Sequence, residues 1–331
     1  MSSSSLSLMV TTALVLAALC GQSQGAAAPL QVGFYKGKCG SADVEAVVYG
    51  VVRAWFATKD NTIAAALLRM QFHDCFVNGC DASILLDGGN NTEKAAIPNL
   101  SVRGYELIDA VKAVVEAACP GVVSCADIIV MATRDAVALS EGGRYMVQTG
   151  RRDGTISLAK NVDLPIPSVS VSDSIQAFAK KGLTATDMIY LLGGHTVGVT
   201  HCSLIRSRLY NFGGTGQADP NMDAALVAAL RARCPQNATM VDNTVNLDQN
   251  PLSSMVVDNS YYKQIVKKRG ILQIDQDLAL DPLSRSTVAA IASGFDFNAR
   301  FGEAMIKLGA VQVLTGKQGQ IRRSCRAINK P

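Results

Sequence analysis

The chain has 331 residues, which is enough for one large domain or two ordinary ones. Hydrophobic residues make up 48% of it and charged residues 18%, so the apolar material for a buried core is ample. The net charge of +4 comes from charges of both signs scattered along the chain, without a block of lysine and arginine, and a nucleic-acid partner is therefore not expected.

The first segment of note is apolar and uncharged and covers residues 6–20. It is too short and too close to the N-terminus for a membrane span, and it is typical of the apolar region of a secretory signal peptide. Small residues follow, with Ser23 and Gly25 at the −3 and −1 positions of a cleavage site. We expect a signal peptide at 1–25 and a single domain at 26–331, without a membrane span in the mature chain. A membrane anchor or a disordered tail is the alternative interpretation.

Apolar residues repeat at three-four spacing over much of the remaining chain, which predicts helices. The clearest stripes cover residues 44–56, 107–118 and 297–308, and Gly309 follows the last one where a helix would stop. Alternating patterns typical of strands are scarce, and only residues 312–323 suggest a short hairpin. The prediction is an all-α chain of roughly ten helices. Two helix starts also fit a capping box, Ser124 with Asp127 and Thr184 with Asp187.

Nine cysteines are present, and Cys20 lies inside the predicted signal peptide. The others form an even set, which suggests disulfides in an exported chain. None of them forms a C-x-x-C pair, so a structural zinc site is not expected. Counting alone leaves the pairing open. The remaining cysteines are Cys39, Cys75, Cys80, Cys119, Cys125, Cys202, Cys234 and Cys325.

Residues 64–86 begin like a buried helix that is apolar on nearly every face, yet Arg69 and His73 lie inside it. Their four-residue spacing puts both side chains on one face of a helix, and the small Ala65 and Ala66 one turn earlier leave room beside them. A cation and an imidazole buried together are costly unless a function needs them there. The alternative is a surface arginine beside a core histidine with satisfied hydrogen bonds, and the spacing alone does not decide between the two.

A second histidine, His195, follows a short apolar helix and a double glycine. Gly193 and Gly194 allow the backbone to turn sharply and to approach another group closely. A histidine presented at such a turn suits an axial metal ligand. Taken alone, a histidine in this position is more often an ordinary loop histidine.

The stretches FHDCFVNGCDAS and LLGGHTVG that contain the two histidines closely resemble the two signature stretches of class III plant peroxidases. The resemblance spans nearly the whole mature chain, and motifs of this length in this order are highly specific. It implies an all-α fold in which two helical halves sandwich haem, with at most a short β-hairpin. The further matching stretches lie at residues 102–109, 123–128, 150–154, 258–262, 275–278 and 315–325.

On one side of the haem, the resemblance implies that His195 binds the iron through one ring nitrogen. Asp275 matches the carboxylate that accepts a hydrogen bond from the other nitrogen, which favours oxidised iron. The family usually has a serine before this aspartate, and this chain has Ile274. The carboxylate itself is retained.

On the other side, His73 matches the general base, which must be neutral to take a proton from peroxide and then delivers it to the departing oxygen. Arg69 supplies positive charge where negative charge develops as the O–O bond breaks. Phe72 would flank the peroxide site. Asn99 matches the residue that fixes the tautomer of the histidine, and Glu93 matches the next member of that network, although the loop before it is slightly short against the family.

The resemblance also implies two calcium sites built from oxygen ligands, which suit a hard cation. The segment between Asp248 and Asp258 is longer than usual, and Ser253 stands where threonine is common. Capping or solvation of helix ends is the alternative role for the carboxylates of the distal set. The distal set is Asp74, Val77, Gly79, Asp81 and Ser83, with Glu93. The proximal set is Thr196, Asp248, Ser253, Val256 and Asp258.

The family's disulfide pairing uses every mature cysteine once, and its donor site includes a residue at the exposed haem edge that Pro165 matches. The family's usual tryptophan before GRRDG is replaced by Tyr145, and no functional prediction follows from this change. The implied bridges are Cys39–Cys119, Cys75–Cys80, Cys125–Cys325 and Cys202–Cys234.

The resulting hypothesis is a secreted, monomeric haem peroxidase with haem b and two Ca²⁺ ions. It would reduce hydrogen peroxide to water and oxidise small phenolic donors by successive one-electron steps. The chain ends soon after Cys325 without an apolar extension, so an extracellular place in the apoplast or cell wall is expected. An intracellular ascorbate-type peroxidase is disfavoured by the signal peptide and the cysteines. An inactive secreted disulfide-rich binding or wall-structural protein is disfavoured by the intact Arg69, His73 and His195.

Three N-x-S/T sequons occur, at Asn90, Asn99 and Asn237. Asn90 and Asn237 lie in loops that should be on the surface and able to carry a glycan. Asn99 is assigned a buried hydrogen bond to His73, so no glycan is expected there. Its sequon is interpreted as an accident of Ser101 following at the required spacing.

Overall fold

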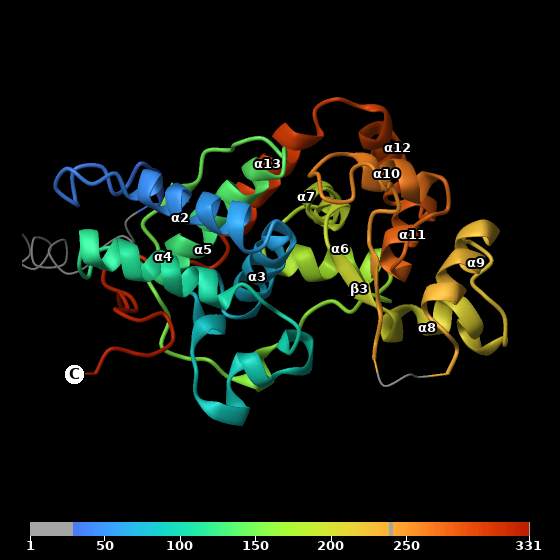
Figure 1. Ribbon diagram of the computed structural model, residues 1–331, viewed down its shortest axis with the longest axis horizontal. Coiled ribbons are helices and arrows are strands. Elements are labelled where there is room, and N and C mark those ends of the chain that lie inside the picture. The colour runs from blue at the N-terminus through green and yellow to red at the C-terminus, as the bar shows by residue number, and fades with distance from the viewer. Residues whose placement is uncertain (1–28, 238–240, 331) are drawn as a thin grey trace, which may run out of the picture.

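The computed structural model describes residues 29–237 and 241–330, so the predicted signal peptide lies outside the described residues (Figure 1). The described residues form a mainly helical fold, and the all-α prediction is confirmed. The helices in chain order are α2 Val44–Thr58, α3 Ile63–Val77, α4 Tyr105–Ala118, α5 Cys125–Leu139, α6 Val171–Lys180, α7 Ala185–Leu192, α8 Cys202–Tyr210, α9 Ala224–Arg233, α10 Ser260–Val266, α11 Gln273–Leu280, α12 Arg285–Ser293 and α13 Phe297–Gly309.

Two small antiparallel sheets join segments that are distant in the sequence. One pairs β1 (Gln31–Val32) with β2 (Gln148–Thr149), and the other pairs β3 (Val199–His201) with β4 (Thr244–Asn246). The predicted hairpin at 312–323 is wrong, because this segment pairs with the chain around Asp153 through single bridges instead of with itself. Short 3₁₀ turns lie at Ser83–Leu85 (η1), Gly89–Asn91 (η2), Glu93–Ala95 (η3), Ile97–Asn99 (η4), Ala159–Asn161 (η5), Gly193–Thr196 (η6) and Phe212–Gly214 (η7).

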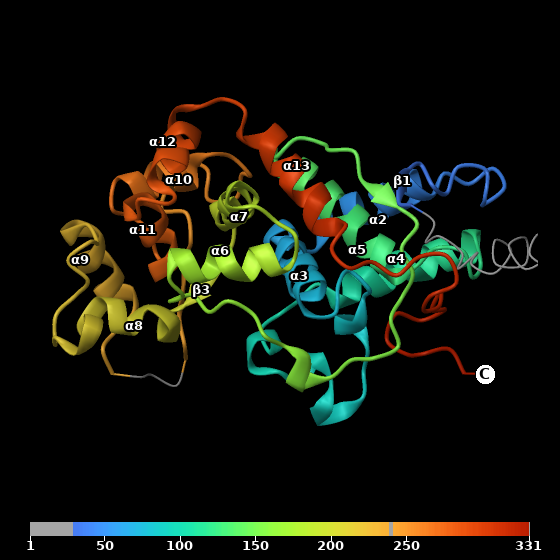
Figure 2. The same cartoon turned by 180° about the vertical axis from the view of Figure 1, so that it is seen from behind.

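The molecule has two halves, each with its own hydrophobic core. In Figures 1 and 2, α2, α4 and α5 lie together in one half and α8 to α12 lie in the other, with α3 between them. The core of the first half takes residues from α2, α4 and α5. The core of the second half takes residues from α6 to α13.

Helix α3 belongs to both cores. Leu67 and Met70 pack into the core of the first half, whereas Leu68 and Phe76 pack into the core of the second half. This explains why the sequence of α3 is apolar on nearly every face, since a helix with that pattern is buried all round. Arg69 is the one exposed residue of α3, so the helix carries a charged side chain into an opening between the two halves.

The two predicted capping boxes have different outcomes. At the start of α7, Thr184 Oγ1 accepts from Asp187 N at 3.1 Å and Asp187 accepts from Thr184 N at 2.9 Å, so this box is confirmed. At the start of α5, Ser124 Oγ accepts from Asp127 N at 3.1 Å, but the Asp127 carboxylate accepts from Tyr35 and Arg151 instead of from Ser124. The reciprocal half of the second box is therefore wrong, because a tertiary salt bridge takes the carboxylate.

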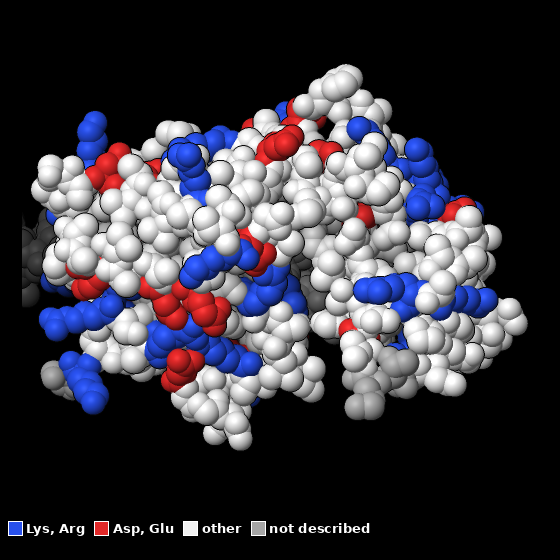
Figure 3. Space-filling view, in the orientation of Figure 1, with Lys and Arg blue, Asp and Glu red and all other residues white. Residues whose placement is uncertain are grey.

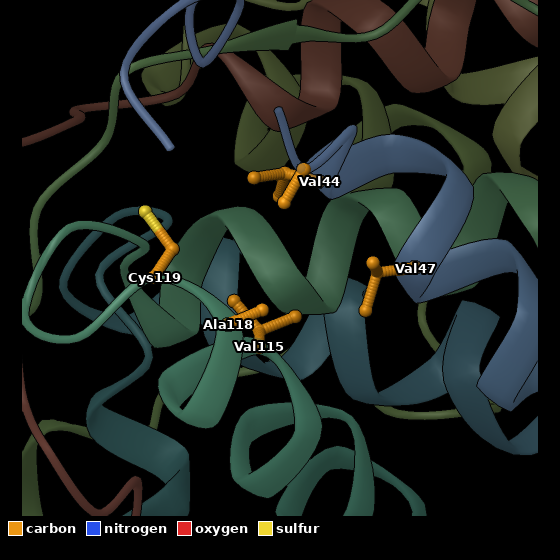
Figure 4. A pocket seen from close by; sticks show the side chains of 6 residues that line it. Val44, Val47, Val115, Ala118 and Cys119 are labelled. Atoms are coloured by element: carbon orange, nitrogen blue, oxygen red, sulfur yellow. The ribbon is translucent and has the colours of Figure 1, made fainter. Parts of the chain in front are cut away.

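A small apolar gap lies between α2 and α4, where side chains from the two helices point toward one another (Figure 4). It has no volume that a water molecule could enter, so it is a packing defect of the core and offers no ligand site.

Within residues 29–237 and 241–330, no helix is long and apolar enough to cross a membrane.

Four disulfides join the cysteines that the resemblance pairs: Cys39–Cys119, Cys75–Cys80, Cys125–Cys325 and Cys202–Cys234. The bridge from Cys125, the first residue of α5, to Cys325 spans 200 residues and ties the C-terminal segment to the first half. The bridge from Cys202 to Cys234 spans 32 residues within the second half.

Replacing Cys125 and Cys325 together by serine should lower the melting temperature more than replacing Cys202 and Cys234. A cross-link restricts the unfolded chain more when it closes a longer loop, and in the chain-entropy model the two loops differ by about 1–2 kcal/mol. Thermal unfolding of the two double variants, followed by circular dichroism, measures this difference. Equal losses of stability in the two variants would contradict the expectation.

Candidate active site

The buried helix α3 presents Arg69 and His73 to the same opening, as their four-residue spacing requires. His73 is 7% exposed, whereas Arg69 is exposed and Phe72 is half-buried. The Phe72 ring packs against Phe76, with ring centroids 4.3 Å apart, and lies 5.9 Å from the His73 ring. The predicted cluster of Arg69, Phe72 and His73 is therefore brought together on one side of the opening.

The η4 turn places Asn99 against His73. Asn99 Oδ1 lies 2.6 Å from His73 Nδ1, and the Asn99 amide donates to the carbonyl oxygen of Glu93 at 2.8 Å. Asn99 is 2% exposed, so water does not compete for this bond. An amide oxygen only accepts hydrogen bonds, so the proton of neutral His73 belongs on Nδ1 and Nε2 carries the lone pair.

The same turn also holds Arg69, which the sequence did not predict. The Arg69 guanidinium donates to Ser101 Oγ at 3.0 Å and to the Pro98 carbonyl oxygen at 2.8 Å. Its Nε donates to His73 Nε2 at 3.2 Å. Ser101 is therefore more than an accidental part of the Asn99 sequon, because its hydroxyl orients Arg69. The bond joins residues 32 positions apart, and no local pattern in the sequence marks it.

The surroundings of His73 keep its imidazole neutral. Burial is the largest cause and the Arg69 charge adds to it, so that together they lower the pKa of His73 to about 4, against the opposing hydrogen bond with Asn99. A neutral imidazole whose Nε2 is unprotonated is able to accept a proton near neutral pH.

Across the opening, His195 lies in the η6 turn that follows α7. Gly193 makes this turn possible, because a Cβ there would lie 2.7 Å from the Phe297 ring and would also meet the Tyr262 hydroxyl. His195 Nδ1 lies 2.8 Å from Asp275 Oδ1, and among residues 29–237 and 241–330 no hydrogen-bond partner lies at Nε2. The sequence had predicted this pair.

The Asp275 carboxylate is itself held by two groups that the sequence analysis did not identify. Tyr261 donates to Asp275 Oδ1 at 2.9 Å, and Leu272 N donates to Oδ2 at 3.2 Å. Burial lowers the pKa of His195, but the adjacent Asp275 carboxylate outweighs burial and the net pKa lies above the usual value. This electron-rich imidazole suits a metal ligand.

The two histidines that face the opening between α3 and η6 suit an iron-containing prosthetic group. The His195 side chain keeps 29% of its surface open although its partner Asp275 is fully buried, and the Arg69 charge acts on it across the opening. Figure 3 shows the surface hollowed between the two halves, with Lys and Arg side chains beside the hollow. His195 Nε2 would hold the iron of a haem group in this opening, and His73 Nε2 would face it from the other side.

A cluster of buried carboxylates lies behind His73. Asp74 is 1% exposed, Asp81 5% and Glu93 0%. Burial, followed by the neighbouring carboxylates, raises the pKa of Asp74 well above its usual range, and burial raises the pKa of Glu93 to about 7. Ser83 Oγ and Glu93 Oε2 are buried without a hydrogen-bond partner of normal geometry. Oxygen atoms in this state fit a hard cation that would offset the buried negative charge.

The carbonyl oxygens of the two backbone ligands predicted for this cluster already accept hydrogen bonds. The Val77 carbonyl oxygen accepts from the Lys181 ammonium at 3.2 Å, so a cation would share it with Lys181. The Gly79 carbonyl oxygen accepts from Asp81 N at 2.8 Å. Among the described residues, no group of three imidazole, thiol or carboxylate side chains is arranged to hold a metal by itself, so a cation here would depend on carbonyl and hydroxyl oxygens as well.

The five residues predicted for the second calcium site also lie close together. Thr196 Oγ1 donates to Asp258 Oδ1 at 3.1 Å and to the Val256 carbonyl oxygen at 3.3 Å. Asp248 is 1% exposed, and Ser253 Oγ lies 3.5 Å from its Oδ2. Asn250 and Ser260 join the group through the hydrogen bonds of the Asn250 amide to Ser253 and Ser260, and the sequence had not pointed to either residue.

Pro165 lies half-buried in the irregular segment between η5 and α6. Asn90 and Asn237 are exposed, whereas Asn99 is buried. The predicted donor contact of Pro165 remains a prediction, and the burial of Asn99 fits its assigned hydrogen bond.

The chain is similar throughout to known peroxidases. A family model described as peroxidase matches residues 48–294. Peroxidase 60 of Arabidopsis thaliana is 52% identical over 313 residues, which cover 94% of this chain and 93% of the relative. Peroxidase 57 of Arabidopsis thaliana is 51% identical over 303 residues, with 91% and 93% covered, and Peroxidase 5 of Vitis vinifera is 45% identical over 308 residues, with 91% and 92% covered. The chain therefore belongs to the peroxidase family, as a class III plant haem peroxidase.

Proposed function

We propose that this peroxidase binds haem b between α3 and η6, reduces hydrogen peroxide to water and oxidises small phenolic donors one electron at a time. One observation carries the proposal. His73 and His195 flank the same opening, and each has its Nδ1 bound, by Asn99 and Asp275 respectively, so that each Nε2 faces the opening, that of His73 beside the Arg69 guanidinium.

In this proposal His195 Nε2 would hold the iron, and the Asp275 carboxylate keeps the imidazole oriented. When bound, haem supplies the iron that splits the peroxide bond and stores the two oxidising equivalents. The half-buried Phe72 and the exposed Arg69 would line the other face. Pro165 would lie at the exposed edge where small aromatic donors dock.

The protein's own residues move the proton. His73 Nε2 takes a proton from one peroxide oxygen and gives it to the other, which leaves as water. Asn99 keeps Nδ1 protonated throughout, so Nε2 is the only basic atom of the ring that faces the opening. Arg69, fixed by Ser101 and Pro98, places positive charge where negative charge grows as the O–O bond breaks.

We also assign a calcium ion to each of the two oxygen clusters. In the first cluster, Ser83 Oγ and Glu93 Oε2 have no hydrogen-bond partner of normal geometry among the described residues, and the pKa values of Asp74 and Glu93 are raised. Both observations support a bound cation that would offset the negative charge of the carboxylates. In the second, burial raises the pKa of Asp248, and the neighbouring Asp258 carboxylate also contributes. Because Asp74 directly follows His73, the first ion would couple the position of the base to the loop beyond α3.

Secretion to the apoplast as a glycosylated monomer completes the proposal. The apolar segment at residues 6–20 and the four disulfides support passage through an oxidising compartment. The exposed sequons at Asn90 and Asn237 are available to the glycosylation machinery.

Replacing His73 by alanine should leave haem bound but slow the reaction with peroxide by about 10²–10⁴-fold, the usual contribution of one positioned acid–base group. In the wild type the rate of this step should fall as the pH drops through about 4, where His73 becomes protonated, and the variant should lack this fall. Stopped-flow spectroscopy of the haem band measures both effects. His201→Ala, which changes an exposed histidine on β3, is the matched control. A His73→Ala variant that reacts at the wild-type rate would show that His73 is not the base.

Removing calcium with a chelator should lower the melting temperature and the rate of the peroxide step together. Metal analysis of the purified protein should find two tightly held calcium ions, and Asp81→Asn should lose one of them. Asp242→Asn, on an exposed loop carboxylate, should keep both. Protein that holds no calcium and keeps its full activity after chelation would rule out both assignments.

Glycopeptide mass spectrometry of the active enzyme should find glycans at Asn90 or Asn237 and none at Asn99. A glycan on Asn99 would pull the amide away from His73 and remove the acceptor that fixes its tautomer. A largely occupied Asn99 in fully active protein would be incompatible with the proposed hydrogen bond to His73.

A further inference from the structure

We propose that the Lys181 ammonium competes with calcium for the Val77 carbonyl oxygen, so that the distal calcium ion is held more weakly and released faster than its own ligands would allow. The inference rests on the calcium assignment proposed above and concerns a lysine that lies outside the ligand set. The distal cluster is the set of predicted ligands Asp74, Val77, Gly79, Asp81, Ser83 and Glu93.

The Lys181 side chain directly follows α6 and has two neutral acceptors. Its Nζ donates to the Val77 carbonyl oxygen at 3.2 Å and to Gln312 Oε1 at 3.0 Å. Among the described residues, no ion pair joins it to the three buried carboxylates of the distal cluster, and the carboxylate that acts on it is that of Asp163, on the exposed segment before α6. The ammonium therefore meets the cluster at a ligand oxygen and does not act as its counter-ion.

The packing of α6 on α3 fixes the position of this lysine. The two helices lie side by side in Figures 1 and 2, and the Phe178 ring of α6 packs against Phe76 of α3 with centroids 4.7 Å apart. The Lys181 backbone amide donates to the Phe178 carbonyl oxygen at 2.9 Å. Since Phe76 directly precedes Val77, this one aromatic contact places the ammonium beside the last residue of α3.

Gln312 holds the ammonium from the other side. Its φ of 47° lies in the left-handed region, which residues other than glycine seldom adopt. A Cβ at Gly79 would meet the Gln312 carbonyl oxygen, and Cys80 N donates to the Val311 carbonyl oxygen at 3.1 Å. The loop that carries the calcium ligands thus closes on the same segment that positions the Gln312 amide, so the ammonium and the loop share one fixed support.

A calcium ion on the Val77 carbonyl oxygen would lie close to the ammonium. Calcium binds oxygen ligands at about 2.3–2.6 Å, so the two cations would be within about 6 Å of each other. The two lone pairs of a carbonyl oxygen allow both groups to bind at once, but the repulsion between the cations then weakens the binding of calcium. Lys181 is half-buried, so solvent reduces this repulsion without removing it.

An ordinary structural role for Lys181 predicts the opposite effect. Val77 is the last residue of α3, and a lysine beside the carbonyl groups at the end of a helix is stabilising. With this role alone, removing the ammonium would loosen the calcium loop, and calcium binding would weaken or stay the same. Competition predicts that calcium is held more tightly, so the sign of the change separates the two roles.

The test mixes the haem-loaded, calcium-loaded enzyme with an excess of a fluorescent calcium chelator in a stopped-flow instrument. Asp81→Asn, which lacks the distal ion, gives the release of the proximal ion alone, and the distal release follows by difference. Lys181→Met should slow the distal release by at least about tenfold and leave the proximal release unchanged. Lys180→Met removes the same charge from the neighbouring exposed residue of α6 and is the matched control, with both release rates unchanged.

Lys181→Gln keeps a hydrogen-bond donor for the Val77 carbonyl oxygen without the charge and should slow the distal release in the same way, which keeps the test valid if Lys181→Met folds poorly. Unchanged or faster distal release in these variants would overturn the competition. Equally slow release in Lys180→Met would overturn the specific role of Lys181 in favour of a general charge effect. If the wild-type enzyme has no calcium to release, the calcium assignment itself fails, which is a different result from unchanged release.

Discussion

Each of two imidazoles has to present an unprotonated Nε2 to one opening, and in each a hydrogen bond at Nδ1 decides which ring nitrogen carries the proton. His73 is fixed by an amide oxygen, which only accepts, so its ring stays neutral and serves as a base. His195 is fixed by a carboxylate, which draws the Nδ1 proton toward itself and makes the ring a stronger ligand. A histidine side chain thus acts as a base beside a neutral amide and as a metal ligand beside a charged carboxylate.

The remainder of the fold keeps these partners in place. Asn99 is held by the Glu93 backbone and Asp275 by Tyr261 and Leu272, and all of these contacts are buried. One short turn holds Asn99 on His73 while its flanking residues hold Arg69, so the base and the cation cannot shift independently. Helix α3 carries both Arg69 and His73 and packs into both cores, which holds the backbone of these two residues in place.

Features that depend on local spacing were predictable from the sequence. The four-residue spacing of Arg69 and His73 specified their shared face, and the apolar surroundings specified a buried α3, because helical geometry alone determines both. The Thr184 capping box formed for the same reason. The roles of Asn99 and Asp275 came only through the family resemblance, since nothing local connects either residue to its histidine.

The errors have a common physical origin. The Asp127 carboxylate left its capping box for Arg151 and Tyr35, and residues 312–323 paired with the chain near Asp153 instead of forming a hairpin. Ser101 looked incidental although it holds Arg69. In each case a contact between residues far apart in the sequence outcompeted or replaced a local one, and a single sequence carries no signal for such contacts.

The C-terminal segment has a consequence for biosynthesis. Arg322 is fully buried in the first half, where it donates to the Ala82 carbonyl oxygen at 2.6 Å, and Cys325 belongs to the core of that half. The first half therefore cannot close until the last part of the chain has left the ribosome. At ordinary rates of synthesis, the 200 residues between Cys125 and Cys325 take about 10–40 s to make. Throughout that interval the partner of Cys125 has not been made, and Cys119 lies only six residues away, so any premature bridge between these two cysteines has to be undone by thiol–disulfide exchange.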